Sequence, residues 1–142
     1  EFTITHPEMT RFNITLEDGI KFVDWCFKNN SGGEIFIPKL KSFKVVDLAK
    51  SIYDEAKLKI IGVRPGEKLH EELISETDSL NSVEGRTAYI ILSGLNTKQI
   101  NKYIKLKKLK RVTPGFKYSS DSNSDFLNSS GLRKILKSQK LI

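Results

Sequence analysis

The residues whose types and spacing could do chemistry lie in one stretch, residues 60–73, which reads I-I-G-V-R-P-G-E-K-L-H-E-E-L. Arg64 and Glu67 lie three residues apart, on either side of Pro65 and Gly66. An arginine presents a planar set of donors that fits two phosphate oxygens, and a nearby carboxylate can accept the hydroxyls of a ribose. This turn could therefore hold a nucleoside diphosphate. The alternative is a helix-starting turn with a local ion pair on solvated surface.

The residues around the turn predict the elements that position it. Ile60–Val63 is a short apolar run beside a glycine, which is typical of a strand. Pro65 restricts Arg64 to extended conformations, and Gly66 permits a tight turn. The apolar residues after the turn recur at helical spacing: Leu69, Leu73 and Ile74. We therefore expect a strand, a Pro-Gly turn and a helix.

Two more segments contain motifs, H-P-E-M-T-R-F at His6–Phe12 and Y-S-S-D-S-N at Tyr118–Asn123. Together with R-P-G-E-K-L-H-E-E-L, and in this order, they resemble the inverting UDP-N-acetylglucosamine 4,6-dehydratases (5-epimerising). These enzymes belong to the extended short-chain dehydrogenase/reductase superfamily and serve bacterial polysaccharide and flagellin-sugar biosynthesis. The resemblance runs from about Thr3 to Lys137 and is weakest over residues 75–112.

The resemblance refines the fold that the element pattern predicts. Strands and helices alternate along the chain, which favours an α/β protein. The resemblance implies the C-terminal lobe of an extended reductase: a small mixed sheet with helices, lacking most of the Rossmann domain. Residues 1–44, with a helix over 16–29 and a strand over 34–37, would return to the Rossmann-side sheet. Residues 45–142 would form the substrate-binding lobe.

The resemblance also implies a reaction and a cofactor. Such enzymes oxidise the sugar at C4 with bound NADP, eliminate water across C5 and C6, and return the hydride at C6 with inversion at C5. They need a glycine-rich phosphate loop and a Tyr-x-x-x-Lys pair. The loop is absent here, and we reject the strings Tyr53–Lys57 and Tyr103–Lys107 because the family's pair lies upstream of this region. We therefore expect no catalytic and no cofactor-binding residue, NADP bound by the missing Rossmann part, and an inactive chain.

The substrate-binding residues are assigned from the matched motifs. R-P-G-E makes Arg64 a diphosphate ligand and Glu67 a ribose ligand. M-T-R-F makes Arg11 a second phosphate-side arginine, and Thr10 adds a hydroxyl; the alternative for Arg11 is a surface residue before a helix. We interpret His70 as a hydrogen-bonded histidine rather than a catalyst. No cluster has metal-ligand spacing, so no metal is predicted.

Charge raises a different class of function. The formal net charge is +7, and one run of seven basic residues with no acid between them equals that excess. The run comprises Lys98, Lys102, Lys105, Lys107, Lys108, Lys110 and Arg111. A basic nucleic-acid-binding module is therefore an alternative, although lysine runs are mostly solvated faces. We do not expect nucleic acid as a partner, and the family resemblance assigns no role to this run.

The cysteine content and the hydropathy of the chain indicate its cellular location. Cys26 is the single cysteine of the 142 residues, no run approaches the ~18 apolar residues of a membrane span, and no signal-peptide pattern opens the chain. We expect a cytoplasmic protein without a membrane partner. The expected partners are a UDP-sugar, the Rossmann domain and, at full length, further copies of the same protein. Alternatives within the superfamily are a UDP-sugar 4-epimerase and the related membrane-bound dehydratase, both of which commonly have Tyr at the position of His70. A non-catalytic interaction protein is a further alternative.

Periodicity predicts the other elements. Thr15 is placed to cap the helix over 16–29, with Asp18 answering it. A second helix is expected from Val45 to Ala56, a strand over residues 88–92, a lysine-rich helix from Thr97 that Pro114 ends, and a short last helix around Leu132. Residues 39–44 and 75–85 are expected to be loops.

Overall fold

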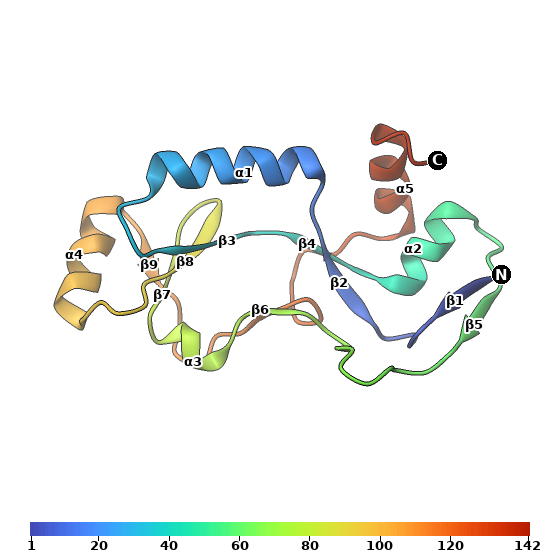
Figure 1. The fold of residues 1–142 in the computed structure, drawn as a ribbon, viewed down its shortest axis with the longest axis horizontal. Coiled ribbons are helices and arrows are strands. Elements are labelled where there is room, and N and C mark those ends of the chain that lie inside the picture. Colours follow the sequence, from blue (N-terminus) through green and yellow to red (C-terminus); the bar gives the residue numbers. More distant parts are fainter. The chain divides into compact units, whose positions relative to one another are not determined.

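The computed structural model describes residues 1–142 (Figure 1). The chain forms two compact units, each assembled from segments far apart in sequence. The first unit comprises Glu1–Asn13, Leu40–Glu71 and Ser119–Ile142, and the second comprises Ile14–Lys39 and Glu72–Tyr118. Five helices and several short strands make a mixed α/β structure, which confirms the predicted fold class. None of the helices combines the length and the apolar character that crossing a bilayer requires.

The first unit contains two strand pairs and two helices. β1 (Phe2–Ile4) pairs in parallel with β5 (Leu58–Ile60), and β2 (Thr10–Asn13) pairs antiparallel with β4 (Lys41–Lys44). The register places Thr10 opposite Lys44 and Asn13 opposite Lys41. The predicted loop over residues 39–44 is therefore wrong for residues 41–44, because their backbone groups pair with β2.

The two helices of the first unit, α2 (Val45–Ile52) and α5 (Ser129–Ser138), pack against each other. Arg133 of α5 donates from Nε to the Ser51 carbonyl at 2.7 Å and from Nη2 to the Lys50 carbonyl at 2.9 Å. It also forms a bidentate pair with Asp54, at 2.6 and 2.9 Å. One arginine thus satisfies carbonyls that the end of α2 would otherwise leave unpaired.

Six of the ten buried residues of the first unit are polar. Its buried apolar residues are Ile4, Met9, Ala49 and Leu132, and its buried polar residues are Thr5, Thr10, Ser42, Ser51, Ser119 and Ser120. No buried side-chain nitrogen or oxygen lacks a hydrogen-bond partner. A polar interior of this kind is stable only while every group stays paired.

The second unit is built on a four-stranded antiparallel sheet in the order β3-β8-β7-β9. Its strands are β3 (Ile35–Pro38), β7 (Ser82–Glu84), β8 (Ala88–Ile91) and β9 (Lys110–Arg111), with β6 (Glu72–Ile74) outside this sheet and β10 (Tyr118–Ser119) where the chain returns to the first unit. Its helices are α1 (Leu16–Asn29), α3 (Glu76–Ser79) and α4 (Thr97–Lys107). The predicted helix over 16–29 is confirmed, with Thr15 Oγ1 accepting from the Asp18 amide at 3.1 Å.

The core of the second unit is apolar. Val83, Ile90, Leu92 and Ile100 form a buried cluster, each at most 4 % exposed. Partly buried hydrophobic residues pack around it: Phe36, Leu95, Tyr103, Ile104 and Leu109. Alternation along β8 directs Ile90 into this cluster, and helical spacing brings Ile100 and Ile104 of α4 to the same side.

Several predicted boundaries are wrong. The strand before the Pro-Gly turn spans Leu58–Ile60 rather than residues 60–63, and the second helix ends at Ile52. Residues 75–85, expected to be a loop, contain α3, which the capping box of Ser75 and Asp78 begins, and β7, which pairs with β8. Asn96, rather than Thr97, caps α4. That helix ends at Lys107, before the left-handed Lys108, and not at Pro114.

Candidate functional site

The turn around Pro65 and Gly66 exists as predicted. The Glu67 amide donates to the Arg64 carbonyl at 3.0 Å, and Gly66 has a φ of +80°. Proline at the second position and a positive φ at the third define a type II turn, which a residue with a Cβ would strain. The Glu67 carboxylate closes the same turn again, because its Oε2 accepts from the Arg64 amide at 3.2 Å and from Arg64 Nε at 3.4 Å.

Glu67 is tied to a second segment. Its Oε1 accepts a hydrogen bond from the Thr5 hydroxyl at 3.1 Å. These donors hold the pKa of the Glu67 carboxyl below its ordinary value; the side-chain bond from Arg64 is the largest cause and the bond from the Arg64 amide is next. A carboxylate offers about four acceptor positions, and three are used here. The ionised group therefore keeps about one position, on Oε1, for a ligand hydroxyl.

Arg64 is the open member of the turn. Its side chain is 73 % exposed, and only its Nε is engaged, by Glu67. Its two terminal nitrogens donate no hydrogen bond within the protein. Two parallel N–H groups held beside a fixed turn can bind two oxygens of one phosphate.

A chain of hydrogen bonds joins the three motifs inside the first unit. The Thr10 hydroxyl lies 2.8 Å from His70 Nδ1 and 2.6 Å from the Ser120 hydroxyl. The Glu71 amide donates to Ser120 Oγ at 2.9 Å, and the Ser120 amide donates to the Glu71 carbonyl at 2.8 Å. Thr10 is 2 % exposed and Ser120 is fully buried. Side chains 60 and 110 residues apart in sequence thus meet in one network.

Arg11 holds the segment after the turn. Its Nη1 donates to the carbonyls of Thr10 at 2.7 Å and Leu69 at 3.1 Å, and its Nη2 donates to the Lys68 carbonyl at 2.9 Å. Its Nε lies 3.5 Å from Glu71 Oε1. Of the five N–H groups of an arginine, one on Nη2 has no partner within the protein. The guanidinium thus fixes the backbone of residues 68–71 and keeps one donor for a ligand.

These bonds explain why the predicted helix after the turn is absent. An α-helix needs the carbonyls of residues 68 and 69 as acceptors for the amides four residues later. Those carbonyls accept from Arg11 instead, and the Leu69 carbonyl also accepts from the Thr10 amide at 3.1 Å. The Glu71 amide is bonded to Ser120 Oγ. The prediction of a helix here is wrong because distant residues take its hydrogen-bonding groups.

The third motif also orders its own surroundings. The Ser119 hydroxyl donates to Asp121, and this bond is the largest cause that holds the pKa of Asp121 below its ordinary value. Asn123 Nδ2 donates to the Leu40 carbonyl at 2.8 Å and to Ser42 Oγ at 3.0 Å. From the sequence, these residues were identified only as a motif of the family resemblance. Nothing in their local spacing showed that Ser120 would bond Thr10.

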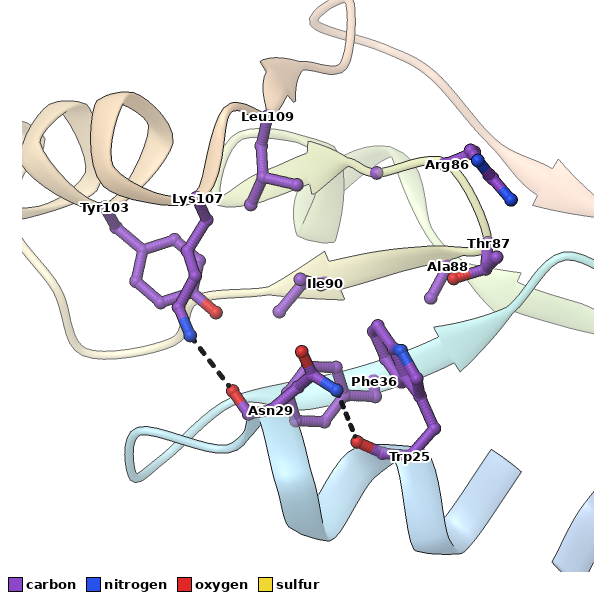
Figure 2. Close-up of a pocket in the computed structure, with 11 residues that line it drawn as sticks. Trp25, Asn29, Phe36, Arg86, Thr87, Ala88, Ile90, Tyr103, Lys107 and Leu109 are labelled. Atoms are coloured by element: carbon purple, nitrogen blue, oxygen red, sulfur yellow. Dashed lines mark hydrogen bonds between the residues drawn. The ribbon is translucent and has the colours of Figure 1, made fainter. Parts of the chain in front are cut away.

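A cavity of about 340 Å³ lies within the second unit. Figure 2 shows Trp25 of α1 and Phe36 of β3 on one side, with Tyr103 and Lys107 of α4 directed toward the same space. Lys107 Nζ donates to the Asn29 carbonyl at 3.3 Å (Figure 2). Burial first, and then the hydrogen bond that its hydroxyl donates to Glu34, raise the pKa of Tyr103 to about 12. With this pKa, Tyr103 keeps its proton at neutral pH. It is therefore unsuited as a general base, which needs a pKa near the working pH.

Comparisons with known proteins agree on one family. A family model described as "Polysaccharide biosynthesis protein" matches residues 1–93. The chain is 41 % identical over 140 residues to an inverting UDP-N-acetylglucosamine 4,6-dehydratase of Campylobacter jejuni, covering 96 % of this chain and 42 % of that protein. A shorter match, 39 % identical over 82 residues, is to the UDP-glucose 4-epimerase of Rickettsia canadensis and covers 55 % of this chain and 24 % of that protein.

Among solved structures, the X-ray structure of Pen from Bacillus thuringiensis is similar in fold. The TM-score is 0.80 at 31 % sequence identity, and the match covers 99 % of this chain and 42 % of that one. This chain therefore spans about two fifths of the length of the dehydratase and of the solved structure that it matches. The fold is that of a part of an extended short-chain dehydrogenase/reductase, as the resemblance implied.

Proposed function

Because the chain belongs to the family of polysaccharide biosynthesis proteins, we propose that it is the nucleotide-sugar-binding part of a UDP-N-acetylglucosamine 4,6-dehydratase. The whole protein would form a 4-keto-6-deoxy sugar with inversion at C5. The observation that supports this most is the meeting of all three motifs in one unit, through Thr10, His70 and Ser120. A network that orders residues 68–71 immediately after an exposed arginine is suited to hold one ligand group in one place.

We propose that Arg64 binds the diphosphate and Glu67 the ribose. The free terminal nitrogens of Arg64 and the one open acceptor position of Glu67 support these roles. The predicted contact of Arg11 with phosphate would use its one remaining N–H, so its main contribution would be to position residues 68–71. Thr10 was also predicted as a ligand. Its hydroxyl is buried and makes two hydrogen bonds within the protein, which favours a positioning role for it as well.

We propose that the cofactor is NADP and that it binds outside these residues, since no G-x-G-x-x-G loop occurs in the chain. The division into residues 1–44 and 45–142 stays a proposal, in which the first segment meets a Rossmann sheet. Two features support the contact with a Rossmann sheet. β3 is an end strand with one unpaired edge, and α1 exposes an apolar stripe: Leu16, Ile20, Val23 and Phe27. The cytoplasmic location and the homo-oligomer also stay predictions.

Titration calorimetry with UDP tests the ligand roles. We expect the chain to bind UDP saturably and Arg64→Ala to weaken binding by at least tenfold, because charge-assisted pairs with phosphate are the strong ones. Lys68→Ala is the matched control, since it removes one exposed positive charge next to the same turn. Equal affinity in the wild type and in Arg64→Ala would contradict the site.

A UDP-sugar 4-epimerase is the second candidate, favoured by the match to the Rickettsia canadensis enzyme. The match to the dehydratase covers far more of the chain, 96 % against 55 %. The two functions differ in their product. Incubating the whole protein with UDP-N-acetylglucosamine should give a 4-keto-6-deoxy sugar, and recovery of the C4 epimer alone would decide for the epimerase.

A further inference from the structure

Part of the basic run forms one surface of the second unit. On α4, Lys98, Lys102 and Lys105 recur at intervals of four and three residues and so lie on one side of the helix. The opposite side packs into the apolar cluster through Ile100 and the partly buried Tyr103 and Ile104. The three lysines are exposed, and none forms an ion pair with a carboxylate.

β9 continues this surface. Both residues of this end strand are exposed, and Arg111, which pairs with the core residue Val83, lies on the α4 side of the sheet, whereas Lys110 lies on the other face. Arg111 Nη2 donates to Asn101 Oδ1 at 3.2 Å, which joins the strand to the helix between Lys98 and Lys105. The partner of Arg111 is thus neutral, and no carboxylate neutralises the positive charge of this surface.

An apolar side chain lies among these cations. Leu106 is 73 % exposed and follows Lys105 on α4. Nucleic acid is a poorer fit, because single strands bind basic surfaces that also offer aromatic rings for stacking. The one aromatic residue of the run, Tyr103, points into the cavity (Figure 2) and donates to Glu34. Lysines around an exposed leucine are the combination that binds an anionic lipid surface.

We propose that the outer face of α4, together with Arg111 of β9, docks on a membrane rich in anionic lipid. The lysines would lie at the level of the headgroups, and Leu106 would enter the boundary of the acyl chains. This goes beyond the nucleotide site and revises the expectation of no membrane partner. That expectation considered spanning segments only, whereas the surface lies on one face of a helix whose other face is buried in the protein.

Sedimentation with vesicles tests the proposal. The full chain should bind vesicles containing phosphatidylglycerol, should not bind pure phosphatidylcholine, and should bind more weakly as salt rises. Each removed cation should lower affinity about fivefold, so Lys98→Gln, Lys102→Gln and Lys105→Gln together should lower it on the order of a hundredfold. Leu106→Gln should weaken binding with no change in charge. Circular dichroism confirms that each variant is folded.

The control removes the same charge elsewhere. Lys50→Gln, Lys134→Gln and Lys137→Gln change three exposed helical lysines of the first unit. This variant should retain most of the vesicle binding. An equal loss in both triple variants would overturn the proposal, because the attraction would then come from net charge alone. Tighter binding to single-stranded or duplex nucleic acid than to the vesicles at the same salt would also overturn it.

Discussion

Each of the two units is stabilised in its interior by a different kind of interaction. The first encloses six buried serine and threonine residues, and its segments are joined by the hydroxyls of Thr10 and Ser120 and by the arginines Arg11 and Arg133. The second encloses an apolar cluster around Leu92. Hydrogen bonds have direction and hydrophobic contacts do not. The unit that holds the candidate site is thus the one whose geometry is specified atom by atom, and the other relies on the more forgiving kind of core.

The largest effect on stability should come from the apolar core. Leu92→Ala should cost about 2–5 kcal/mol of unfolding free energy, because it leaves a cavity in a cluster where Leu92 is 1 % exposed. Urea unfolding measures the loss, and hydrogen exchange should locate it in β7, β8 and α4. Leu106→Ala, at an exposed leucine of the same unit, should change stability by less than about 0.5 kcal/mol. Faster exchange in the first unit alone would contradict the separation of the two cores.

A smaller loss of stability with a larger loss of function is expected in the polar unit. Thr10→Val keeps the shape but strands the Ser120 hydroxyl and His70 Nδ1, at a cost of about 1–3 kcal/mol. UDP affinity should fall as well, because residues 68–71 lose their anchor. Thr3→Val, at an exposed threonine of β1, is the control. A fully stable Thr10→Val protein would show that the buried network does not hold this unit.

Arg11→Lys keeps the positive charge but removes the planar guanidinium. It therefore separates a role in holding the backbone from a role in binding the ligand. A lysine can satisfy only some of the three carbonyls that Arg11 binds. We therefore expect the free energy of unfolding to fall by about 1 kcal/mol and UDP binding to weaken. Arg86→Lys, at an exposed arginine of the second unit, should change neither quantity. If stability stays unchanged while UDP binding falls, Arg11 acts on the ligand directly and not through the backbone.

The smallest expected effect is a difference in pH dependence. The pKa of Tyr103 is raised to about 12 by burial and by Glu34. A raised pKa favours the protonated folded form, so the resulting stability is present below about pH 10 and is lost as the pH rises toward 12. Urea unfolding should show the wild type losing stability relative to Tyr103→Phe across this range. Tyr53→Phe, an exposed tyrosine of the first unit, should follow the wild type. A constant difference between the wild type and Tyr103→Phe would contradict the effect.

The sequence predicted the second unit better than the first. The helix over 16–29 and the strand over residues 88–92 were found because apolar periodicity is written locally, and they end within a residue of α1 and β8. The same periodicity misled at Leu69, Leu73 and Ile74. There the backbone is committed to Arg11 and Ser120, which lie far away in the sequence.

The candidate site divides in the same way. The Pro-Gly turn was predicted and the local ion pair of Arg64 with Glu67 was the alternative considered for it, because both follow from four consecutive residues. The contact between Thr10 and Ser120 was not, because no local pattern determines which hydroxyl meets which across 110 residues. The family resemblance identified the three motifs, but it did not predict which of their atoms are in contact.

The hydrogen-bond chain through Thr10 also fixes which atom of His70 bears the hydrogen. Ser120 Oγ accepts from the Glu71 amide, so the hydroxyl hydrogens find acceptors in one order only: Ser120 donates to Thr10, and Thr10 donates to His70 Nδ1. In the reverse order the buried Ser120 hydroxyl hydrogen would have no acceptor. The neutral imidazole is therefore the tautomer with hydrogen on Nε2. A backbone amide one residue along the chain thus determines, through two hydroxyls, that this ring can offer only a donor to whatever it meets.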